Sequence, residues 1–223
     1  RQAKFPLEEV VKTSRFGIWI SMFITWVLTG CIVVFILLMP GFVGGVLGFS
    51  PFETTYFQMG GLVCIVSSCW LTGRLADKHN PSTLCILFSA GFAVSSVAFF
   101  SLLYTAAPVV SEVVLAYFAT CFFAGIMNFC PIFMCDVFPA RIRFSGISFA
   151  YNIAYALSGA FTPQLSFALH AYAKTHPDTL GAMGLSAYIV FLALVSIGTA
   201  LAMRRVYKNG GAAVSQMEFR PAP

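Results

Sequence analysis

Five polar or amphipathic side chains lie inside long apolar stretches of this sequence, where polar groups need partners. They are Trp26, Gln58, Asn128, Asn152 and Tyr155. Amide and hydroxyl groups can donate hydrogen bonds to a carboxylate, and aromatic rings can stack on a quaternary ammonium group. This chemistry suits the binding of a small polar molecule, and we take these five as candidate binding residues.

The sequence does not supply a catalytic triad. Ser158-Gly159 resembles part of the nucleophile motif of rhomboid-like serine proteases, but Ala156-Leu157 before it departs from that motif. The last apolar stretch contains no histidine that could act as a base. The three histidines all fall in expected loops: His79, His170 and His176. We therefore expect that the protein is not an enzyme.

Seven cysteines also lie within apolar runs: Cys31, Cys64, Cys69, Cys85, Cys121, Cys130 and Cys135. Zinc and disulfide sites need closer, loop-borne spacing, whereas a buried cysteine behaves as a small apolar residue. We expect no metal and no cofactor.

The composition around these residues is strongly apolar. Of 223 residues, 59% are hydrophobic and 9% are charged, and the mean hydropathy is +0.86. Soluble domains carry about 25% charged residues. The net charge of +5 comes from short clusters between apolar runs, not from the polar basic patch that nucleic-acid binding needs. The composition indicates an all-α membrane protein without a nucleic-acid partner.

Six uncharged stretches are long enough to cross a membrane, which takes about 20 apolar residues. Pro40-Gly41 is expected to end the first stretch. Ser50 and Glu53 suit a capping box before the second, and Asn80-Pro81 supplies a cap and a first-turn proline for the third. The expected spans are residues 16–39, 50–72, 81–104, 111–135, 144–169 and 183–203.

The basic residues predict the orientation of these spans. Twelve of the 13 Lys and Arg residues fall in the two ends and in loops 73–80 and 136–143, and only Lys174 falls in another loop. By the positive-inside rule, both ends are cytoplasmic. Residues 1–15 then form a cytoplasmic linker, 16–203 the membrane helices and 204–223 a cytoplasmic tail. Because the first dozen residues are mixed in charge and do not begin with Met, we expect a longer protein.

The fifth expected span carries the clearest polar face. Its members recur at spacings of three and four, which places them on one side of a helix: Ser145, Ser148, Asn152, Tyr155, Gly159, Thr162 and Ser166. A polar stripe facing lipid is costly, so this face meets other helices or a water-filled cavity. Close packing explains the serines and the glycine, whereas the larger Asn152 and Tyr155 favour a cavity lining.

Three other spans carry weaker polar faces. These are Thr54, Gln58, Gly61, Ser68 and Thr72 in the second span, Thr120, Ala124, Asn128, Pro131 and Cys135 in the fourth, and Ser21, Thr25, Trp26 and Thr29 in the first. The third and sixth spans are apolar or small almost throughout, which predicts two peripheral helices. No ionisable residue lies within the six span cores, so we expect proton-titrating groups outside this chain.

Two basic loops contain spaced motifs. They read Gly73-x-x-x-Asp77-Lys78 and Asp136-x-Phe138-Pro139-x-Arg141-x-Arg143-x-Ser145-Gly146. Asp136 is expected at a helix C-terminus, where the dipole disfavours a carboxylate, so we expect Arg141 or Arg143 to compensate it. Asp77 is expected just before a helix N-terminus, where negative charge is favoured. Ordinary topology-setting charge explains both positions equally well.

The first motif resembles the loop that transporters of the major facilitator superfamily repeat in each half. The second is similar to the acidic-x-F-P-x-R-x-R-x-S-G signature of the metabolite:proton symporters, a family that includes proline/betaine, shikimate, citrate and 2-oxoglutarate transporters. The resemblance covers the whole chain as the last six of twelve helices. The first loop departs from the family pattern, since His79-Asn80-Pro81 stands where Gly-Arg-Arg usually follows.

This resemblance implies two inverted three-helix repeats, with substrate at the midplane between two halves. It implies proton-coupled symport of a small organic acid or compatible solute across the inner membrane by alternating access, with the N-terminal half as partner. The implied conformational or gating residues are Gly73, Asp77, Lys78, Asp136, Arg141 and Arg143. A channel subunit remains an alternative, although no selectivity-filter loop is visible, and an intramembrane enzyme is a weaker one.

Overall fold

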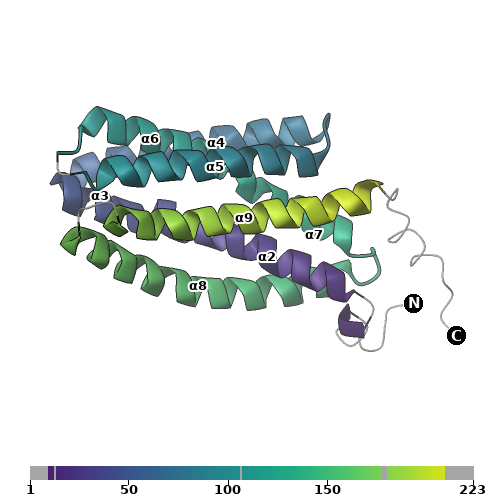
Figure 1. The fold of residues 1–223 in the computed structure, drawn as a ribbon. Coiled ribbons are helices and arrows are strands. Elements are labelled where there is room, and N and C mark those ends of the chain that lie inside the picture. Colours follow the sequence, from purple (N-terminus) through teal and green to yellow (C-terminus); the bar gives the residue numbers. More distant parts are fainter. Residues whose placement is uncertain (1–9, 13, 106, 177–179, 209–223) are drawn as a thin grey trace, which may run out of the picture.

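The computed structural model describes residues 10–12, 14–105, 107–176 and 180–208. Within them the chain is helical and contains no strand, and the long helices lie side by side in one bundle (Figure 1). The elements are α2 (Arg15–Cys31), the π-helix η1 (Ile32–Leu38), α3 (Met39–Leu47), α4 (Pro51–Ala76), α5 (Pro81–Leu103), α6 (Val110–Phe123), the 3₁₀-helix η2 (Ala124–Asn128), α7 (Phe129–Val137), α8 (Arg143–Thr175) and α9 (Leu180–Lys208).

Five continuous helical stretches are long and apolar enough to cross a membrane, which confirms the predicted all-α membrane class. They are Arg15–Leu47, Pro51–Ala76, Pro81–Leu103, Val110–Val137 and Met183–Lys208. The fifth expected span, α8, is a single helix of 33 residues, about 50 Å at 1.5 Å per residue. Its length suffices, but it is too polar to count among the five.

The prediction that Pro40-Gly41 ends the first span is wrong. The helix continues to Leu47 and ends at Gly48, whose φ of 70° supplies a left-handed C-cap. Pro40 lies in the first turn of α3, and the wider turns of the π-helix η1 precede it. In a membrane the backbone must keep its hydrogen bonds inside the helix or find other partners, so a Pro-Gly pair can lie within a helix without ending it.

The fourth span is also irregular. The 3₁₀-helix η2 separates α6 from α7 and ends three residues before Pro131. A proline disturbs the helical turn before it, and a tighter 3₁₀ segment is a common response. The irregular part of the fourth span therefore lies directly before Pro131.

The two predicted helix starts are confirmed. The Ser50 hydroxyl accepts from the Glu53 N–H at 3.4 Å, and the Glu53 carboxylate accepts from the Ser50 N–H at 2.8 Å, which completes a capping box. The Asn80 side chain accepts from the Ser82 N–H at 2.9 Å. Both caps satisfy backbone donors that a helix start leaves free.

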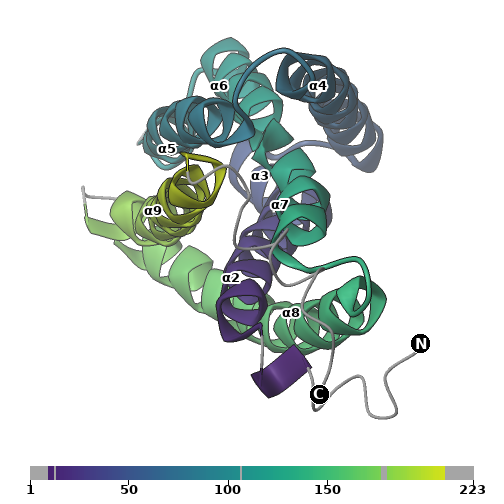
Figure 2. The same cartoon turned by 90° about the vertical axis from the view of Figure 1, so that its right-hand side faces the viewer.

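The packing of the helices separates two sides of the bundle. α5 and α9 pack along one another, and Figure 2 shows them on the side opposite α4 and α7. α2 contacts α7, α8 and α9, while α4 packs on α6 and η2. Buried serines join α5 and α9, since the Ser89 hydroxyl donates to Ser196 at 2.8 Å. Such small polar contacts are typical of helix interfaces in membranes.

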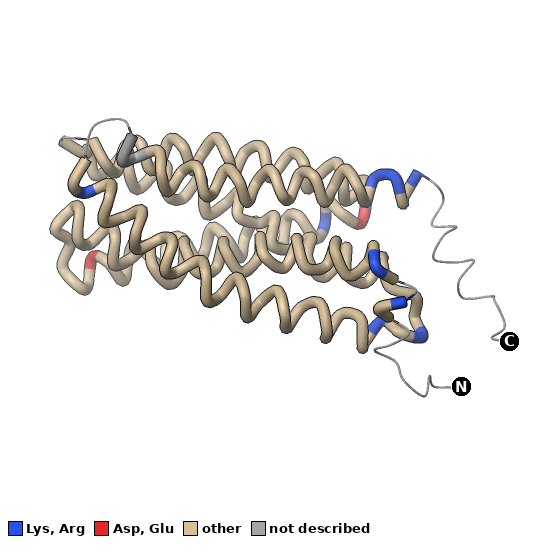
Figure 3. The backbone as a smooth tube through the Cα atoms, turned by 60° about the horizontal axis from the view of Figure 1, so that its bottom comes forward, with Lys and Arg blue, Asp and Glu red and all other residues tan. Residues whose placement is uncertain are grey.

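Charge is concentrated at one end of the bundle. Figure 3 shows most of the Lys and Arg residues of the described chain at the end where α2 and α8 begin and α9 finishes. Lys174, near the finish of α8, lies at the opposite end. The long middle parts of the helices carry no charged residues within the described ranges.

Candidate functional site

The buried side of α8 is a line of small residues. They recur every four residues: Gly146, Ala150, Ala154, Ser158, Thr162 and Ser166. Each step of four drifts about 40° round a helix of 3.6 residues per turn. The buried line therefore winds round α8, which contacts both α2 and α9. Small residues there let the helix backbones approach closely.

This packing buries part of the predicted polar stripe of α8 and leaves the rest exposed. Thr162 and Ser166 are buried, whereas Asn152 and Tyr155 are exposed and Gly159 has open space where a side chain would begin. The first of these larger residues, Asn152, donates only to the carbonyl of Ser148 on its own helix, at 2.7 Å. The amide is thus retained on the helix surface and is not used to join helices.

An aromatic pair continues this exposed face. The rings of Tyr151 and Tyr155 stack with centroids 5.5 Å apart and planes 22° from parallel, and Tyr155 is 43% exposed. Sequence reasoning missed Tyr151, which lies four residues before Tyr155 and so on the same side of the helix. We call Ser148, Tyr151, Asn152, Tyr155 and Gly159 the polar face of α8.

Trp26 is engaged in an inter-helix network. Its indole N–H donates to the Tyr188 hydroxyl of α9 at 3.4 Å, and that hydroxyl lies 2.7 Å from the Thr162 hydroxyl of α8. The indole also meets the Phe161 ring edge to face at 6.1 Å. Trp26 therefore ties α2, α8 and α9 together, through a tyrosine that the sequence analysis did not single out.

Gln58 is engaged at the irregular part of the first span. Its amide donates to the carbonyl of Ile36 at 2.9 Å, and the Tyr117 hydroxyl of α6 donates to the carbonyl of Phe35 at 2.8 Å. These carbonyls lie four and five residues before Pro40, which has no N–H to offer them. The side chains of Gln58 and Tyr117, from two other helices, donate the hydrogen bonds that Pro40 cannot donate. A tyrosine within an apolar span needs a hydrogen-bond partner, which is the signal that could have singled out Tyr117.

Asn128 joins η2 to α4. Its amide donates to the carbonyl of Cys69 at 3.2 Å and to the Thr72 hydroxyl at 3.3 Å. A side chain at Gly73 would begin 3.5 Å from this amide. Gly73, expected to act in gating, thus lies beside Asn128, and a side chain at this position would meet the amide at ordinary van der Waals distance.

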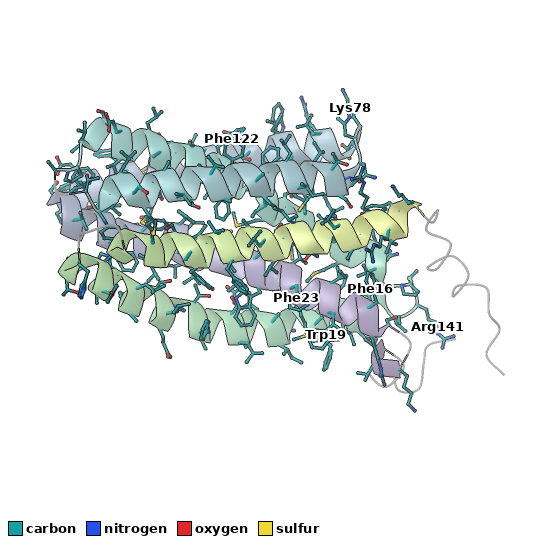
Figure 4. The ribbon with its side chains drawn as sticks, viewed as in Figure 1. Phe16, Trp19, Phe23, Lys78, Phe122 and Arg141 are labelled. Carbon is teal, nitrogen blue, oxygen red and sulfur yellow. The ribbon has the colours of Figure 1, made fainter. Side chains whose placement is uncertain are left out.

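The other polar positions of the first two spans pack inward. Thr25 and Thr29 of α2 are buried, as are Ser68 and Thr72 of α4. On α2 the exposed stripe is aromatic instead and consists of Phe16, Trp19 and Phe23, which Figure 4 labels toward the end of the bundle that carries Lys78 and Arg141. These four polar residues therefore serve packing, and on α2 aromatic rings cover the outside.

The loop carboxylates lie in settings that the sequence did not predict. Asp136 accepts from the Tyr207 hydroxyl of α9 at 2.5 Å, while Arg143 donates to the carbonyl of Phe138 at 3.1 Å. Asp77 is the C-cap of α4, not a residue favoured by a following helix start, because Asn80 caps α5. Asp136 thus joins the ends of α7 and α9 through a hydroxyl.

His170 lies in a helix and not in the loop that the sequence predicts. His170 lies within α8, which extends beyond the expected limit at Leu169, and His176 follows directly after the helix. The seven cysteines are free thiols, and no cluster of His, Cys, Asp and Glu suited to a metal occurs among the described residues.

Of the five candidate residues, the structure leaves two on an open surface. Trp26, Gln58 and Asn128 use their donors within the fold, at three separate places, while Asn152 and Tyr155 share the polar face of α8. Figure 2 shows α4, α7 and the nearer end of α8 on one side of the bundle, while the rest of α8 crosses toward α9. Pro131 and Cys135 of α7, part of the predicted face of the fourth span, are exposed as well.

The chain is thus a multi-pass helical bundle that keeps the Asn152 amide and Tyr155 on an exposed surface of α8. The sequence profile of the Major Facilitator Superfamily matches residues 1–163, well over half of the chain, and the chain belongs to that superfamily. It is therefore a secondary transporter for a small molecule and not an enzyme. The match does not single out a subfamily. No curated protein and no solved structure matches the chain.

Proposed function

We propose that this chain is the six-helix C-terminal half of a proton-coupled symporter and that the polar face of α8 lines its transport path. One observation carries the proposal: the Asn152 amide stands on an exposed helix surface in a protein with only 9% charged residues. A polar group in lipid is costly. Contact with water or with the other half of the transporter would remove this cost.

The packing of α8 supports its role as the sixth membrane helix. It lies along α2 and α9 in the same bundle as the five apolar spans, and its small-residue line provides the close contacts of a membrane helix. The residues that lower its hydropathy include Ser148, Asn152 and Gln164. A helix that borders a water-filled path is expected to be less apolar than its neighbours.

The pattern of helix pairs supports two three-helix repeats. The first span packs on the fifth helix, α8, and the fourth span packs on the second helix, α4, while α5 packs on α9. A two-fold relation exchanges the first helix with the fourth, the second with the fifth and the third with the sixth. It converts the pair of first and fifth helices into the pair of fourth and second, and it leaves the pair of third and sixth unchanged. Both first helices of the two triplets are irregular near a proline, at η1 and at η2. Inverted repeats of this kind place substrate between two halves.

The charge distribution supports an orientation with the basic end in the cytoplasm. Both ends of the chain and the loops with Asp77, Lys78, Asp136, Arg141 and Arg143 are then on the cytoplasmic side of the inner membrane. In that position, contacts that form in one conformation of the transporter can involve three residues. They are Asp136, which is held by Tyr207, and the exposed Asp77 and Lys78.

The substrate class is a small organic acid or a compatible solute such as a betaine. Amide and phenol donors suit a carboxylate, and the stacked tyrosines suit a quaternary ammonium group. A fully charged substrate would need a counter-charge from the N-terminal half, since the middle parts of the described helices carry none.

The experiment is uptake of labelled organic acids and betaines by vesicles that carry the full-length protein, with and without a proton ionophore. We expect accumulation that the ionophore abolishes. Uptake against a gradient that persists with the ionophore would contradict proton coupling.

The uptake assay also tests whether the polar face of α8 lines the transport path. Asn152→Ala should reduce uptake by at least tenfold at unchanged expression, because it removes a donor from the path. Leu157→Ala is the control, since Leu157 is similarly exposed but lies about 140° round the helix. Equal uptake by the two variants would remove Asn152 from the path.

A further inference from the structure

Three aromatic rings of α2 are exposed on the outside of the bundle. Phe16, Trp19 and Phe23 follow one another at spacings of three and four residues, which places them along one side of the helix. Trp19 is 58% exposed, and its ring stacks on that of Phe23 with centroids 5.8 Å apart and planes 26° from parallel. Figure 4 shows the three residues on the part of α2 that is visible between α9 and α8. We call them the ring surface of α2.

The ring surface does not face the side of the bundle that α4 and α7 form. The Thr25 hydroxyl lies 3.8 Å from the Cys130 sulfur of α7, so this side of α2 points to α7. The three rings lie about 120–180° round the helix from Thr25. They therefore point away from α7 and from the side that we assign to the N-terminal half (Figure 2).

The ring surface is closed at its inner end. Trp26, the next position of this stripe, is partly buried, because its indole meets the Phe161 ring of α8 at 6.1 Å and donates to the Tyr188 hydroxyl of α9 at 3.4 Å. From Arg15 to Trp26 the helix rises about 16 Å, which is about half of the ~30 Å hydrocarbon core of a bilayer. The exposed rings therefore span one leaflet of the membrane.

The open end of the ring surface is basic. Arg15 is exposed in the first turn of α2, and α9 finishes at the same end with the exposed Arg204 and Arg205. Of the carboxylates in the described ranges, those at this end are Asp77 on α4 and Asp136 on α7, and both of these helices lie on the other side. The charge beside the rings is therefore positive, and positive charge at the membrane surface attracts anionic headgroups.

We propose that the ring surface of α2 binds an anionic phospholipid, whose acyl chains lie on Phe16, Trp19 and Phe23 and whose phosphate meets Arg15. The length of the surface fits the chains of one leaflet, and the charge at its open end fits the headgroup. A zwitterionic lipid would cover the same rings but gain less from Arg15. The inference rests on the proposed function only in naming the leaflet, which is the cytoplasmic one in the orientation given above.

The test uses the fluorescence of Trp19 in the full-length protein, reconstituted in vesicles of phosphatidylcholine and phosphatidylglycerol in a four-to-one ratio. At one fixed mole fraction, either lipid is replaced in turn by its form with brominated chains, which quenches tryptophan on contact. Subtracting the emission of a Trp19→Phe variant isolates Trp19. We expect the quenching to report roughly fivefold enrichment of phosphatidylglycerol at Trp19, the effect of one basic residue at the membrane surface.

Two variants of Arg15 and a second tryptophan make this test decisive. Arg15→Gln should abolish the enrichment at Trp19, whereas Arg15→Lys should retain it, because the charge attracts the headgroup. Trp70 of α4 is the control, since it is 60% exposed. Its emission, isolated with Trp70→Phe, should not respond to Arg15→Gln.

Three results would overturn the proposal. They are equal quenching of Trp19 by the two brominated lipids, an enrichment that survives Arg15→Gln, and a response of equal size at Trp70. A Trp19 that neither lipid quenches would overturn it as well, because protein would then cover the rings. No substrate or gradient is present, so the outcome is independent of the uptake assay.

Discussion

At the scale of single residues, Gln58 and Tyr117 show what a polar side chain does in an apolar bundle. Each donates to a carbonyl near Pro40, where the helix cannot supply its own N–H. Without these donors the carbonyls would lose a partner in a region that lipid or packed side chains keep free of water. The two residues therefore stabilise the irregular first span.

Replacing the Tyr117 hydroxyl tests this role. Tyr117→Phe should lower the free energy of unfolding by about 0.5–1.5 kcal/mol, the range for hydrogen bonds between membrane helices. Thermal unfolding of the detergent-solubilised full-length protein measures the change. Tyr56→Phe is the control, because Tyr56 is exposed on α4. Equal midpoints for the two variants would show that the Phe35 carbonyl does not depend on Tyr117.

The candidate binding residues explain why the candidate site was only partly predictable. Spacing and residue type single out Trp26, Gln58 and Asn128 as candidate binding residues, and the structure gives each of them a partner within the fold. The sequence does not reveal whether the partner is a ligand or another helix, because that depends on which helices are neighbours. For Asn152 the sequence was more informative, since a large amide among serines and glycine is poorly suited to close packing.

At the scale of elements, glycines set how closely the helices approach. A β-carbon on Gly61 of α4 would lie 2.5 Å from the Tyr117 ring. That ring cannot move aside easily, because it is stacked on Phe57 at 4.0 Å and bonded to the Phe35 carbonyl. The contact between α4 and α6 thus depends on the absence of a side chain at position 61.

Adding one methyl group tests the contact. Gly61→Ala should lower the free energy of unfolding by about 1–3 kcal/mol, as overpacking does, and the same thermal assay measures it. Gly198→Ala adds the same methyl group to α9 where there is nothing within 4 Å, and it should be neutral or slightly stabilising. A Gly61→Ala variant as stable as Gly198→Ala would mean that the two helices are less closely packed than described.

The start of a helix was predictable where a single capping side chain fixes it. The end of a helix was not predictable where the chain stays helical beyond a turn signal or beyond the apolar stretch. Ser50 and Asn80 bond to the first N–H groups of α4 and α5, so short motifs suffice. Pro40-Gly41 is a turn signal in water, but in this chain η1 accommodates the proline and the helix continues. The limit of α8 at Leu169 was also too early, because hydropathy falls before the helix ends.

At the scale of the whole molecule, the side of the bundle that carries the polar face of α8 is not covered by the chain's own helices. α5 and α9 pack on each other away from α4 and α7 (Figure 2), and the polar face of α8 stays exposed. Composition predicted a membrane bundle with two peripheral helices, and the superfamily assignment accounts for an uncovered side. We infer that this side meets the N-terminal half across a water-filled path.

Thiol labelling of the polar face tests this central claim most directly. Asn152→Cys and Leu157→Cys are each placed in full-length protein with Cys135→Ser, since Cys135 is exposed, and are treated in membrane vesicles with a charged maleimide that does not enter lipid. We predict at least tenfold faster labelling at position 152 than at position 157, because only the former borders water. Equal rates, or an unreactive Asn152→Cys in vesicles of either orientation, would contradict the account.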